Sequence, residues 1–411
     1  MKSLQSILLA LTFISLGPTY VYPDELRVSI QLQPKQREKF EPFFHRFFIE
    51  TGIEVKTQVE SDIEYKRKVP IWLEDGIDTP DVMFWSASQR LYKYAEMDLI
   101  LPITDLWEEE KYDDQFKLMK HGVSYKGEIY AVPFAHYHWG LFYRKSMVDK
   151  FGGLPNDWDS FLSLLERMKK AEITPIGIGT KQKWPAAAWF DYINLRTNGL
   201  QFHLELLEGK ISFNDSKVQN VLVEWKRLID SNYYNPDHMS HRWDGVLPLF
   251  YRNQIGFLLL GNFVASRWPV NQELYDDIGF LPFPKMQENY PYYENAPTDV
   301  FMIPKSTKKE KQAKAFIRFI ARPDVQTALN NDLGYLPPNT KSSVGEDRFV
   351  QAGALLFQRA DGLAQFFDRD APPEFAKLAT PILAEFISTG DIKTVTLKLE
   401  QARLAIFASP Q

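Results

Sequence analysis

The stretch YKGEIYAVPFAHYHWGLFYR, residues 125–144, contains two predicted strands that follow one another closely. Residues 130–134 and 140–143 are rich in aromatic and β-branched side chains, and each run is too short for a helix. A segment that contains His136 and His138 separates the two runs. We therefore predict a sheet here, and the flanking sequence indicates what kind of sheet it is.

Strand and helix patterns alternate on both sides of this stretch. Apolar stripes with helical spacing follow Asn156 or Asp157, follow Asp215 and precede Pro323. Further β-like runs lie between them, at residues 26–30, 55–59, 81–85, 175–179, 255–261, 278–283 and 300–303. This alternation indicates α/β layers rather than a sandwich or a helical bundle. From residue 350 onward the pattern becomes wholly helical, which predicts a helical C-terminal segment.

Composition and charge exclude several classes of protein. The chain has 411 residues, of which 45% are hydrophobic and 25% charged, so it has enough apolar material for two cores. The formal net charge is -5, and without a basic surplus we expect no nucleic-acid partner. There is no cysteine, which excludes disulfides, thiolate metal sites, thiol nucleophiles and the lipid-bearing cysteine of a lipoprotein.

The first residues have the outline of a signal peptide. Lys2 precedes an apolar run at residues 7–16, which is too short to span a bilayer, and Gly17 and Pro18 then end any helix. We expect residues 1–23 to be the signal peptide of a protein that diffuses freely in the periplasm. Bulky residues near the expected cleavage point leave an uncleaved anchor as the alternative.

Catalytic and metal-binding motifs are absent from the sequence. It has no Gly-rich phosphate loop, no nucleophile elbow and no His-Glu-x-x-His pair, so we expect neither an enzyme nor a cofactor. The pairs His136 with His138 and His238 with His241 lack a clear third ligand, and we expect no metal site there. Carboxylate pairs suit a glycosidase, but charge clusters are usually solvated faces.

Aromatic residues are abundant, with ten Trp, 19 Tyr and 30 Phe. Trp85 ends a predicted strand, Trp184 lies in a polar loop, and Trp243 and Trp268 follow turns. Aromatic rings offer flat apolar faces to sugar C–H groups, while nearby Asp, Asn and Arg side chains satisfy hydroxyl groups. The pattern favours a sugar site, and burial in a core is the alternative for each ring.

A series of short motifs gives the sequence its family resemblance. In chain order they are TPDVMFW (79–85), YKGEIYAVP (125–133), LFYRK (141–145), LPNDW (154–158), GNF (261–263), IGFLPFP (278–284), Asp299 before Ile-Pro (303–304), and GYLP (334–337). In this order and spacing they resemble the bacterial extracellular solute-binding protein family 1. These are the sugar-binding components of ABC importers, and maltose-binding protein is among them. The segment 365–374 looks like a stretch found in a subgroup of these receptors.

The resemblance implies the two-lobed α/β fold of periplasmic binding proteins, with a hinged ligand cleft. Both lobes are then discontinuous. Residues 24–134 and 286–335 form the N-terminal lobe, and residues 135–285 and 336–411 form the C-terminal lobe. Crossings between the lobes are expected near residues 133–137, 282–285 and 333–338.

Ligand-contacting residues follow from the resemblance and from position. Trp85 stands where maltose-binding protein has a sugar-contacting Trp, and Tyr137 stands where it has a contacting Glu near a crossing. Residues 366–370 precede Pro372 and Pro373, which imply a shaped turn at the cleft, although a solvated salt-bridging loop is the alternative. The predicted ligand-binding residues are Trp85, Tyr137, Trp184, Trp189, Asn262, Trp268, Asp299, Phe366, Asp368, Arg369 and Asp370.

The function implied by the resemblance is transport. A monomer captures a sugar or short oligosaccharide between its lobes and delivers it to the membrane permease of an ABC-type importer. A ligand-sensing subunit for a membrane receptor is the alternative, because both proteins would present the same closed surface. A carbohydrate-active enzyme is the third possibility. An Asp that follows the sugar-contacting Trp in maltose-binding protein is matched here by Ser88 or Gln89, which leaves the identity of the sugar open.

Overall fold

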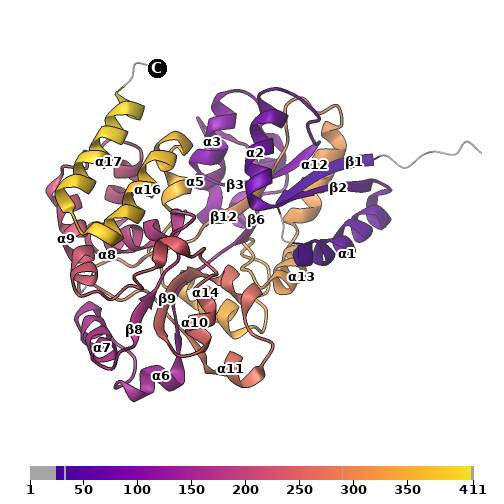
Figure 1. Ribbon diagram of the computed structural model, residues 1–411. Coiled ribbons are helices and arrows are strands. Elements are labelled where there is room, and N and C mark those ends of the chain that lie inside the picture. Colours follow the sequence, from indigo (N-terminus) through magenta and orange to yellow (C-terminus); the bar gives the residue numbers. More distant parts are fainter. Residues whose placement is uncertain (1–24, 32–33, 289, 409–411) are drawn as a thin grey trace, which may run out of the picture.

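Two separate β-sheets, each covered by helices, organise the chain into two lobes (Figure 1). The computed structural model describes residues 25–31, 34–288 and 290–408, so the predicted signal peptide lies outside the described residues. Within these ranges, no helix is both long and apolar enough to cross a bilayer.

The N-terminal lobe contains a five-stranded sheet. In spatial order its strands are β2 (Glu54–Glu60), β1 (Glu25–Gln31), β3 (Val82–Ser86), β12 (Thr298–Met302) and β6 (Ala131–His136). The first three are parallel, whereas β12 is antiparallel to both of its neighbours. Pro133 lies in β6, and a proline is tolerated there because β6 is an edge strand.

The C-terminal lobe contains a four-stranded sheet. In spatial order its strands are β10 (Ile278–Leu281), β7 (Trp139–Arg144), β9 (Ile255–Gly261) and β8 (Thr174–Gly177). Two small sheets pair β11 (Tyr293–Asn295) with β13 (Gly362–Ala364), and β4 (Ser124–Tyr125) with β5 (Glu128–Ile129). The β4–β5 turn has Lys126 and Gly127 both at positive φ, which is the backbone of a type I′ hairpin.

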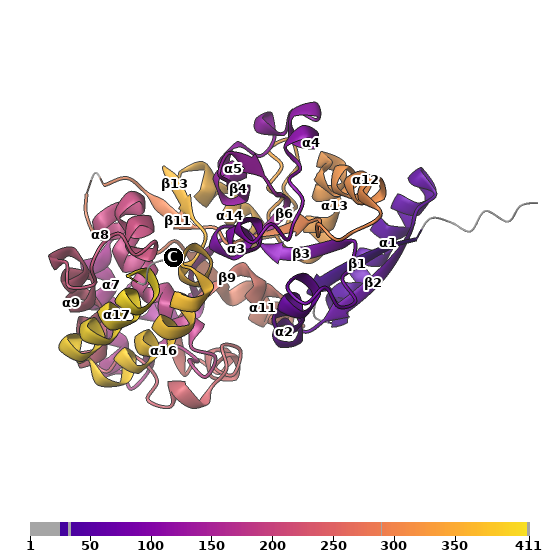
Figure 2. The same cartoon turned by 90° about the horizontal axis from the view of Figure 1, so that it is seen from above.

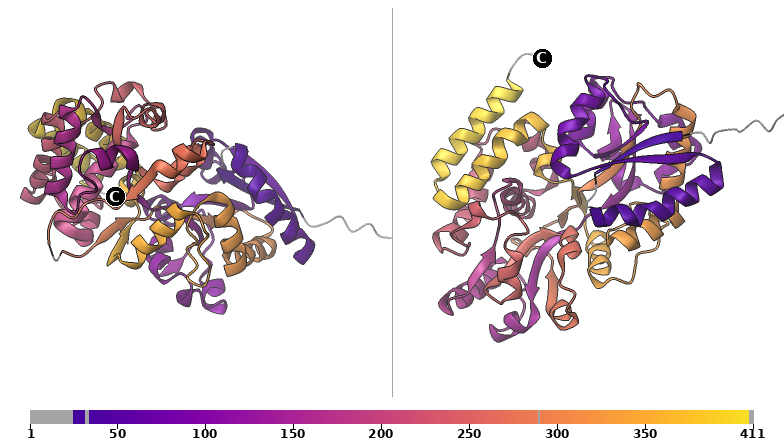
Figure 3. Two further views of the ribbon diagram at one scale, coloured as in Figure 1. Left: turned by 90° about the horizontal axis from the view of Figure 1, so that it is seen from below. Right: turned by 45° about the vertical axis from the view of Figure 1, so that its right-hand side comes forward.

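Helices cover both sheets. Those of the N-terminal lobe are α1 (Pro34–Thr51), α2 (Asp62–Leu73), α3 (Gln89–Glu96), α4 (Thr104–Glu109), α5 (Lys120–Val123), α12 (Glu310–Ala321) and α13 (Pro323–Leu333), with the 3-10 turns η1 (Tyr112–Asp114) and η2 (Lys117–Met119). Those of the C-terminal lobe are α6 (Lys145–Lys150), α7 (Trp158–Lys170), α8 (Ala187–Leu207), α9 (Ser216–Asp230), α10 (Leu247–Tyr251), α11 (Gln272–Asp277), α14 (Arg348–Gln358), α15 (Phe367–Asp370), α16 (Pro373–Thr389) and α17 (Ile392–Phe407), with η3 (Trp184–Ala186), η4 (His238–Ser240) and η5 (Asn262–Arg267). The yellow helices α16 and α17 lie at the far end of the molecule from α1 and α2 (Figures 2 and 3).

Local signals in the sequence explain where several helices begin and end. The Asp157 side chain accepts a hydrogen bond from the Ser160 N–H at 2.8 Å, which caps the first turn of α7. Asp215 caps α9 in the same way through the Lys217 N–H. Gly334 ends α13 at φ 73°, a left-handed conformation that glycine adopts without a steric penalty.

Each lobe has its own hydrophobic core. Trp107 and Phe134 are among the largest fully buried side chains of the N-terminal core, and Trp189 and Trp225 are among those of the C-terminal core. Full burial of such side chains contributes about 1.5–3 kcal/mol each. The two cores are separate because the chain crosses between the lobes only in short segments.

The crossings follow β6, β10 and α13. The first and third lie side by side, because the His136 N–H donates to the Leu336 carbonyl at 3.0 Å and the Leu336 N–H donates back to the His136 carbonyl at 3.1 Å. Reciprocal backbone hydrogen bonds between two crossings restrict the paths along which the lobes can move.

The second crossing extends further along the chain than we predicted. We placed the return to the N-terminal lobe at residue 286, but Glu294 is fully buried against the C-terminal lobe, where it pairs with Arg196 and accepts a hydrogen bond from the Tyr192 hydroxyl at 2.9 Å. A buried charge needs such partners, and they keep this segment on α8 until β12 begins at Thr298. The expected wholly helical C-terminal segment also contains the short strand β13, which is held by its pairing with β11.

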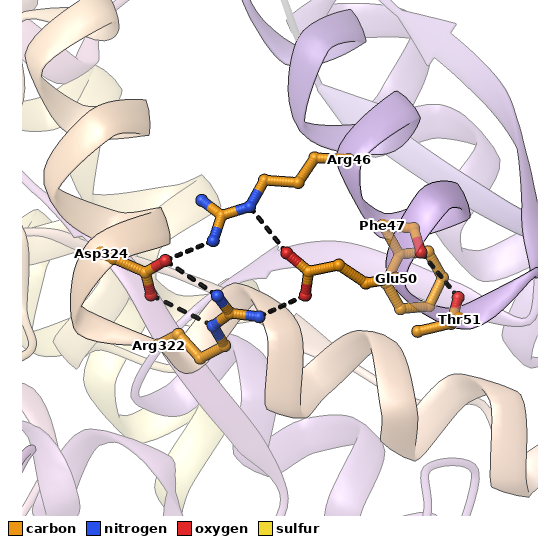
Figure 4. A network of polar contacts seen from close by, with 6 residues as sticks. All are labelled: Arg46, Phe47, Glu50, Thr51, Arg322 and Asp324. Carbon is orange, nitrogen blue, oxygen red and sulfur yellow. Dashed lines mark hydrogen bonds and ion pairs between the residues drawn. The ribbon is translucent and has the colours of Figure 1, made fainter.

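On the outer face of the N-terminal lobe, a network of four charged side chains joins α1 to α13 (Figure 4). Arg46 donates to Glu50 at 2.8 Å, and Arg322 donates to Asp324 at 2.8 Å. Cross-contacts from Arg46 to Asp324 and from Arg322 to Glu50 complete the network. These side chains are more than one-third exposed, so solvent screens their interactions.

Candidate ligand-binding site

A cavity of about 260 Å³ lies between the two lobes. Its N-terminal wall includes Gln31 and Ser86, which end β1 and β3, and Arg90 from α3. Its C-terminal wall includes Gln182 and Trp184, from the segment after β8, and the turn η5 that follows β9. Strand ends therefore converge on the cavity from both sheets, as expected of ligand sites in open α/β sheets.

The C-terminal wall of the cavity is aromatic. The rings of Trp139 and Phe366 stack with centroids 4.7 Å apart, and Trp184 meets Trp139 edge-on at 5.9 Å. Phe263 extends this surface, with Trp139 at 5.7 Å and Trp243 at 5.2 Å. Trp184 and Trp243 are only half-buried, so the wall presents rigid apolar faces to a ligand.

Two ion pairs cross the cavity from the segment 366–370. The Arg90 guanidinium donates to the Asp368 carboxylate at 2.6 Å and to the Asp368 carbonyl at 2.8 Å. The Arg369 guanidinium lies 3.1 Å from the Asp299 carboxylate. Arg90 and Asp299 belong to the N-terminal lobe, whereas Phe366 of the same segment packs in the C-terminal core. The segment therefore contacts both lobes beside the cavity.

Asp299 and Tyr137 form the buried end of this arrangement. The Tyr137 hydroxyl donates to the Asp299 carboxylate, and the side chain of Asp299 is 2% exposed. Burial raises the pKa of Asp299 above its usual range, and the neighbouring Arg369 opposes this shift. Burial raises the pKa of Tyr137 as well, so its hydroxyl stays protonated as a donor at neutral pH.

Six of the eleven predicted ligand-binding residues line the cavity. They are Tyr137, Trp184, Asp299, Phe366, Asp368 and Arg369. All except Trp184 belong to the crossings or to the motif segments, where the order of residues carried information about the site. The other five predicted residues do not line the cavity, and their surroundings explain why.

Trp85 lies in the core of the N-terminal lobe instead of at the cleft. It is 7% exposed, stacks against Tyr65 at 6.3 Å, and donates its indole N–H to the Arg90 carbonyl at 2.9 Å. Successive residues of a strand point to opposite faces of the sheet. Phe84 and Ser86 line the cavity, so Trp85 between them points away from it.

Two further tryptophans expected at the cleft are core residues of the C-terminal lobe. Trp189 is 1% exposed within α8, where it packs edge-on against Tyr234 at 5.5 Å. Trp268 packs against Phe142 at 5.4 Å, on the side of the sheet that carries Phe349. Both follow strands as predicted, but the helix α8 and the end of η5 turn these rings inward.

Asn262 and Asp370 hold the backbone rather than face the cavity. The Asn262 amide donates to the Gly334 carbonyl at 2.8 Å, which links η5 to the end of α13. Asp370 accepts hydrogen bonds from the Ser88 hydroxyl at 2.7 Å and from the Gln365 N–H at 2.6 Å. Burial raises the pKa of Asp370, because the ionised carboxylate is removed from water. The two side chains thus support the loops that form the cavity.

Several lining residues were not predicted from the sequence. They include Lys66, Arg90, Trp139, Arg242, Trp243, Phe263 and Arg267. Trp139 and Phe263 lie inside the quoted motifs, so position in a motif was an available signal for them. The four cations had none, because their loops and helices meet only in the folded chain.

The histidine pairs do not form a metal site in the described part of the chain, where no group of three or more ligating side chains occurs. His136 and His138 are buried near the first crossing, and burial lowers the pKa of each to about 3. Both rings are therefore neutral at physiological pH.

Comparison with known proteins places this fold in a family. Residues 33–327 match the family model described as bacterial extracellular solute-binding protein. An uncharacterised ABC transporter extracellular-binding protein of Pyrococcus horikoshii, PH1214, is 27% identical over 268 residues, or 63% of this chain and 58% of the relative. Its paralogue PH1039 is covered over 52% of its length, so the chain spans little more than half of these two relatives.

Two other similar proteins are covered more fully. A probable sugar-binding periplasmic protein of Mesorhizobium japonicum is 24% identical over 335 residues, or 75% of this chain and 76% of the relative. The solved structure of the bacterial solute receptor AcbH, described with an exclusive preference for b-D-galactopyranose, superposes with a TM-score of 0.85 at 23% identity. It covers 94% of this chain and 100% of AcbH, which confirms the predicted two-lobed fold. By its sequence match and its fold, this chain belongs to the bacterial extracellular solute-binding proteins.

Proposed function

We propose that the protein is a periplasmic binding protein that captures a sugar or short oligosaccharide and delivers it to the permease of an ABC-type importer. The observation that carries this proposal is the pairing of an aromatic wall with polar groups around one cavity between two lobes. The relatives described as sugar-binding support the sugar class. The cavity of about 260 Å³ lies near the small end of the usual range of roughly 300–1,000 Å³, which favours a small ligand.

Each wall of the cavity suits one part of a sugar. The half-buried faces of Trp184 and Trp243 fit the C–H groups of a pyranose ring. Asp299 and Asp368 supply acceptors and Arg369 supplies donors for hydroxyl groups, and these side chains already hold one another in place. Because preorganised polar groups lose little conformational entropy on binding, such a site favours affinity.

Delivery to a permease requires that binding changes the shape of the protein. The cavity walls belong to different lobes joined by three short crossings, so a ligand that contacts both walls stabilises the closed arrangement. A membrane partner that binds only the closed form would then distinguish loaded from empty protein. The proposed partner is the permease of the importer, and the proposed acting form is a monomer.

The first experiment is a ligand screen by thermal shift and isothermal titration against mono-, di- and trisaccharides. A ligand that binds the native state alone must raise the melting temperature by mass action. Trp184→Ala should weaken binding of any hit by about 10- to 100-fold, which corresponds to loss of about 1.4–2.7 kcal/mol of contact energy. Phe48→Ala, at a partly exposed ring on α1 outside the cavity, is the matched control. Absence of any response to neutral and acidic sugars would exclude the proposal.

A further inference from the structure

The cavity has an excess of positive charge although the whole chain is acidic. Its lining contains five cationic side chains and two anionic ones, whereas the formal net charge of the chain is -5. The two anionic side chains are Asp299 and Asp368, and each is already engaged by an arginine, Arg369 and Arg90 respectively. The positive excess therefore resides in the other three cations, Lys66, Arg242 and Arg267.

Arg242 and Arg267 share one carboxylate between them. Their guanidinium groups lie 3.4 Å and 3.8 Å from Asp244, which is not part of the cavity lining. Among the described residues, neither guanidinium donates a hydrogen bond with acceptable geometry. One carboxylate balances one of the two positive charges, so a net charge and most of the ten N–H donors of the pair remain for another group.

The two arginines are held at the aromatic wall of the cavity. Arg242 directly precedes Trp243, and the Trp243 N–H donates to the Gln182 side chain at 3.4 Å. The Arg267 carbonyl accepts a hydrogen bond from the Tyr251 hydroxyl at 2.7 Å. Their side chains are 55% and 44% exposed, so the heads reach solvent in the cavity while the backbone is fixed.

We infer that the ligand is an anionic saccharide whose carboxylate, sulfate or phosphate group is bound by Arg242 and Arg267. This inference rests on the proposed sugar-binding function and specifies the class of sugar. Guanidinium groups bind these oxyanions through two parallel hydrogen bonds, and such charge-assisted bonds are stronger than neutral ones. Lys66 of α2 brings a further cation from the N-terminal wall. A neutral sugar would leave the excess positive charge of the cavity uncompensated.

The test compares matched neutral and anionic sugars by isothermal titration. The pairs are galactose with galacturonic acid, glucose with glucuronic acid, and glucose with glucose 6-phosphate or glucose 6-sulfate, which separate the three oxyanions. We expect at least one anionic member to bind tenfold or more tightly than its neutral partner. Its affinity should fall as sodium chloride is raised, because salt screens charges at a partly exposed site.

Variants locate the charge effect. Arg242→Gln and Arg267→Gln should each weaken binding of the anionic sugar about tenfold and leave the melting temperature of the empty protein unchanged. Arg252→Gln, an exposed arginine outside the cavity lining, is the matched control and should bind like the unmodified protein. Binding of the neutral partner sugar, where measurable, should change less than twofold in all three variants.

The outcomes separate this inference from the proposed function. If neutral sugars bind as tightly as anionic ones and the two arginine variants change nothing, the inference is wrong and sugar binding stands. If a non-sugar acid such as citrate binds through both arginines and no sugar binds, the proposed function is wrong and the anion site stands. If none of these compounds binds, both are overturned.

Discussion

Replacing Trp85 with alanine distinguishes a core role of this ring from a ligand-binding role. The resemblance to sugar receptors assigns Trp85 to the ligand, whereas the structure places it in the N-terminal core, 7% exposed. Its ring contacts Tyr65 and Tyr94 at centroid distances of 6.3 Å and 6.0 Å. Its indole N–H donates to the Arg90 carbonyl at 2.9 Å. We therefore expect stability, not affinity, to change.

The magnitude follows from these contacts. Truncation of a buried tryptophan to alanine removes its apolar burial and leaves a cavity, at a cost of about 3–5 kcal/mol. The lost hydrogen bond accounts for about 1 kcal/mol of that total. Trp85→Phe retains most of the ring but no N–H, so we expect a loss of about 1–2 kcal/mol. Affinity for the identified ligand should fall less than tenfold in both variants, because the ring does not line the cavity.

The assay is urea unfolding followed by circular dichroism, together with isothermal titration well below the unfolding transition. The lobes have separate cores, so the unfolding curves are fitted with an intermediate if two transitions appear. Trp184→Ala, in the cavity wall, is the comparison and should show the opposite pattern of large affinity loss and small stability loss. If Trp85→Ala lost less than about 1 kcal/mol of stability and more than tenfold in affinity, the structural reasoning would be refuted.

Burial raises the pKa of Asp191 well above its usual range, so ionisation destabilises the native state as pH rises from about 4. The unfolding free energy of Asp191→Asn should therefore gain on that of the unmodified protein between about pH 4 and pH 8 in urea titrations, and parallel curves would contradict this. Arg196→Met leaves the fully buried Glu294 unpaired and should cost about 3–5 kcal/mol, measured by urea unfolding, with recovery when Glu294 is also replaced by leucine. Asp324→Asn breaks only the exposed network of Figure 4 and should cost less than about 1 kcal/mol. A cost that persisted in 1 M salt would show that screening is weaker there than we infer.

Periodic and local signals made most of the elements predictable. The runs at 130–134 and 140–143 became β6 and β7, because aromatic and β-branched residues in short runs favour extended backbone. Asp157 and Asp215 cap α7 and α9, because a carboxylate satisfies free N–H groups in the first turn of a helix. Such signals act within a few residues, so they can be read without knowledge of the fold.

Boundaries that depend on distant partners were predicted less well. The return to the N-terminal lobe was placed at residue 286, but the pairing of Glu294 with Arg196 holds this segment on the C-terminal lobe. These two residues are 98 positions apart in the chain. No local pattern marks such a pair, so the position of the boundary required the tertiary structure.

The sequence by itself determined the α/β class, the two-lobed family and the chemical character of the site, because residue order and aromatic content carry that information. Only the tertiary structure decided which side chains face the cavity. Trp85 and Ser86 are adjacent, yet the two-residue period of β3 directs one into the core and the other to the ligand space. Arg242 and Arg267 approach the same carboxylate only because the segment before α10 and the turn η5 meet in the folded lobe. Electrostatic excess in a cavity is a property of side chains brought together from separate segments, and it arises only when the chain has folded.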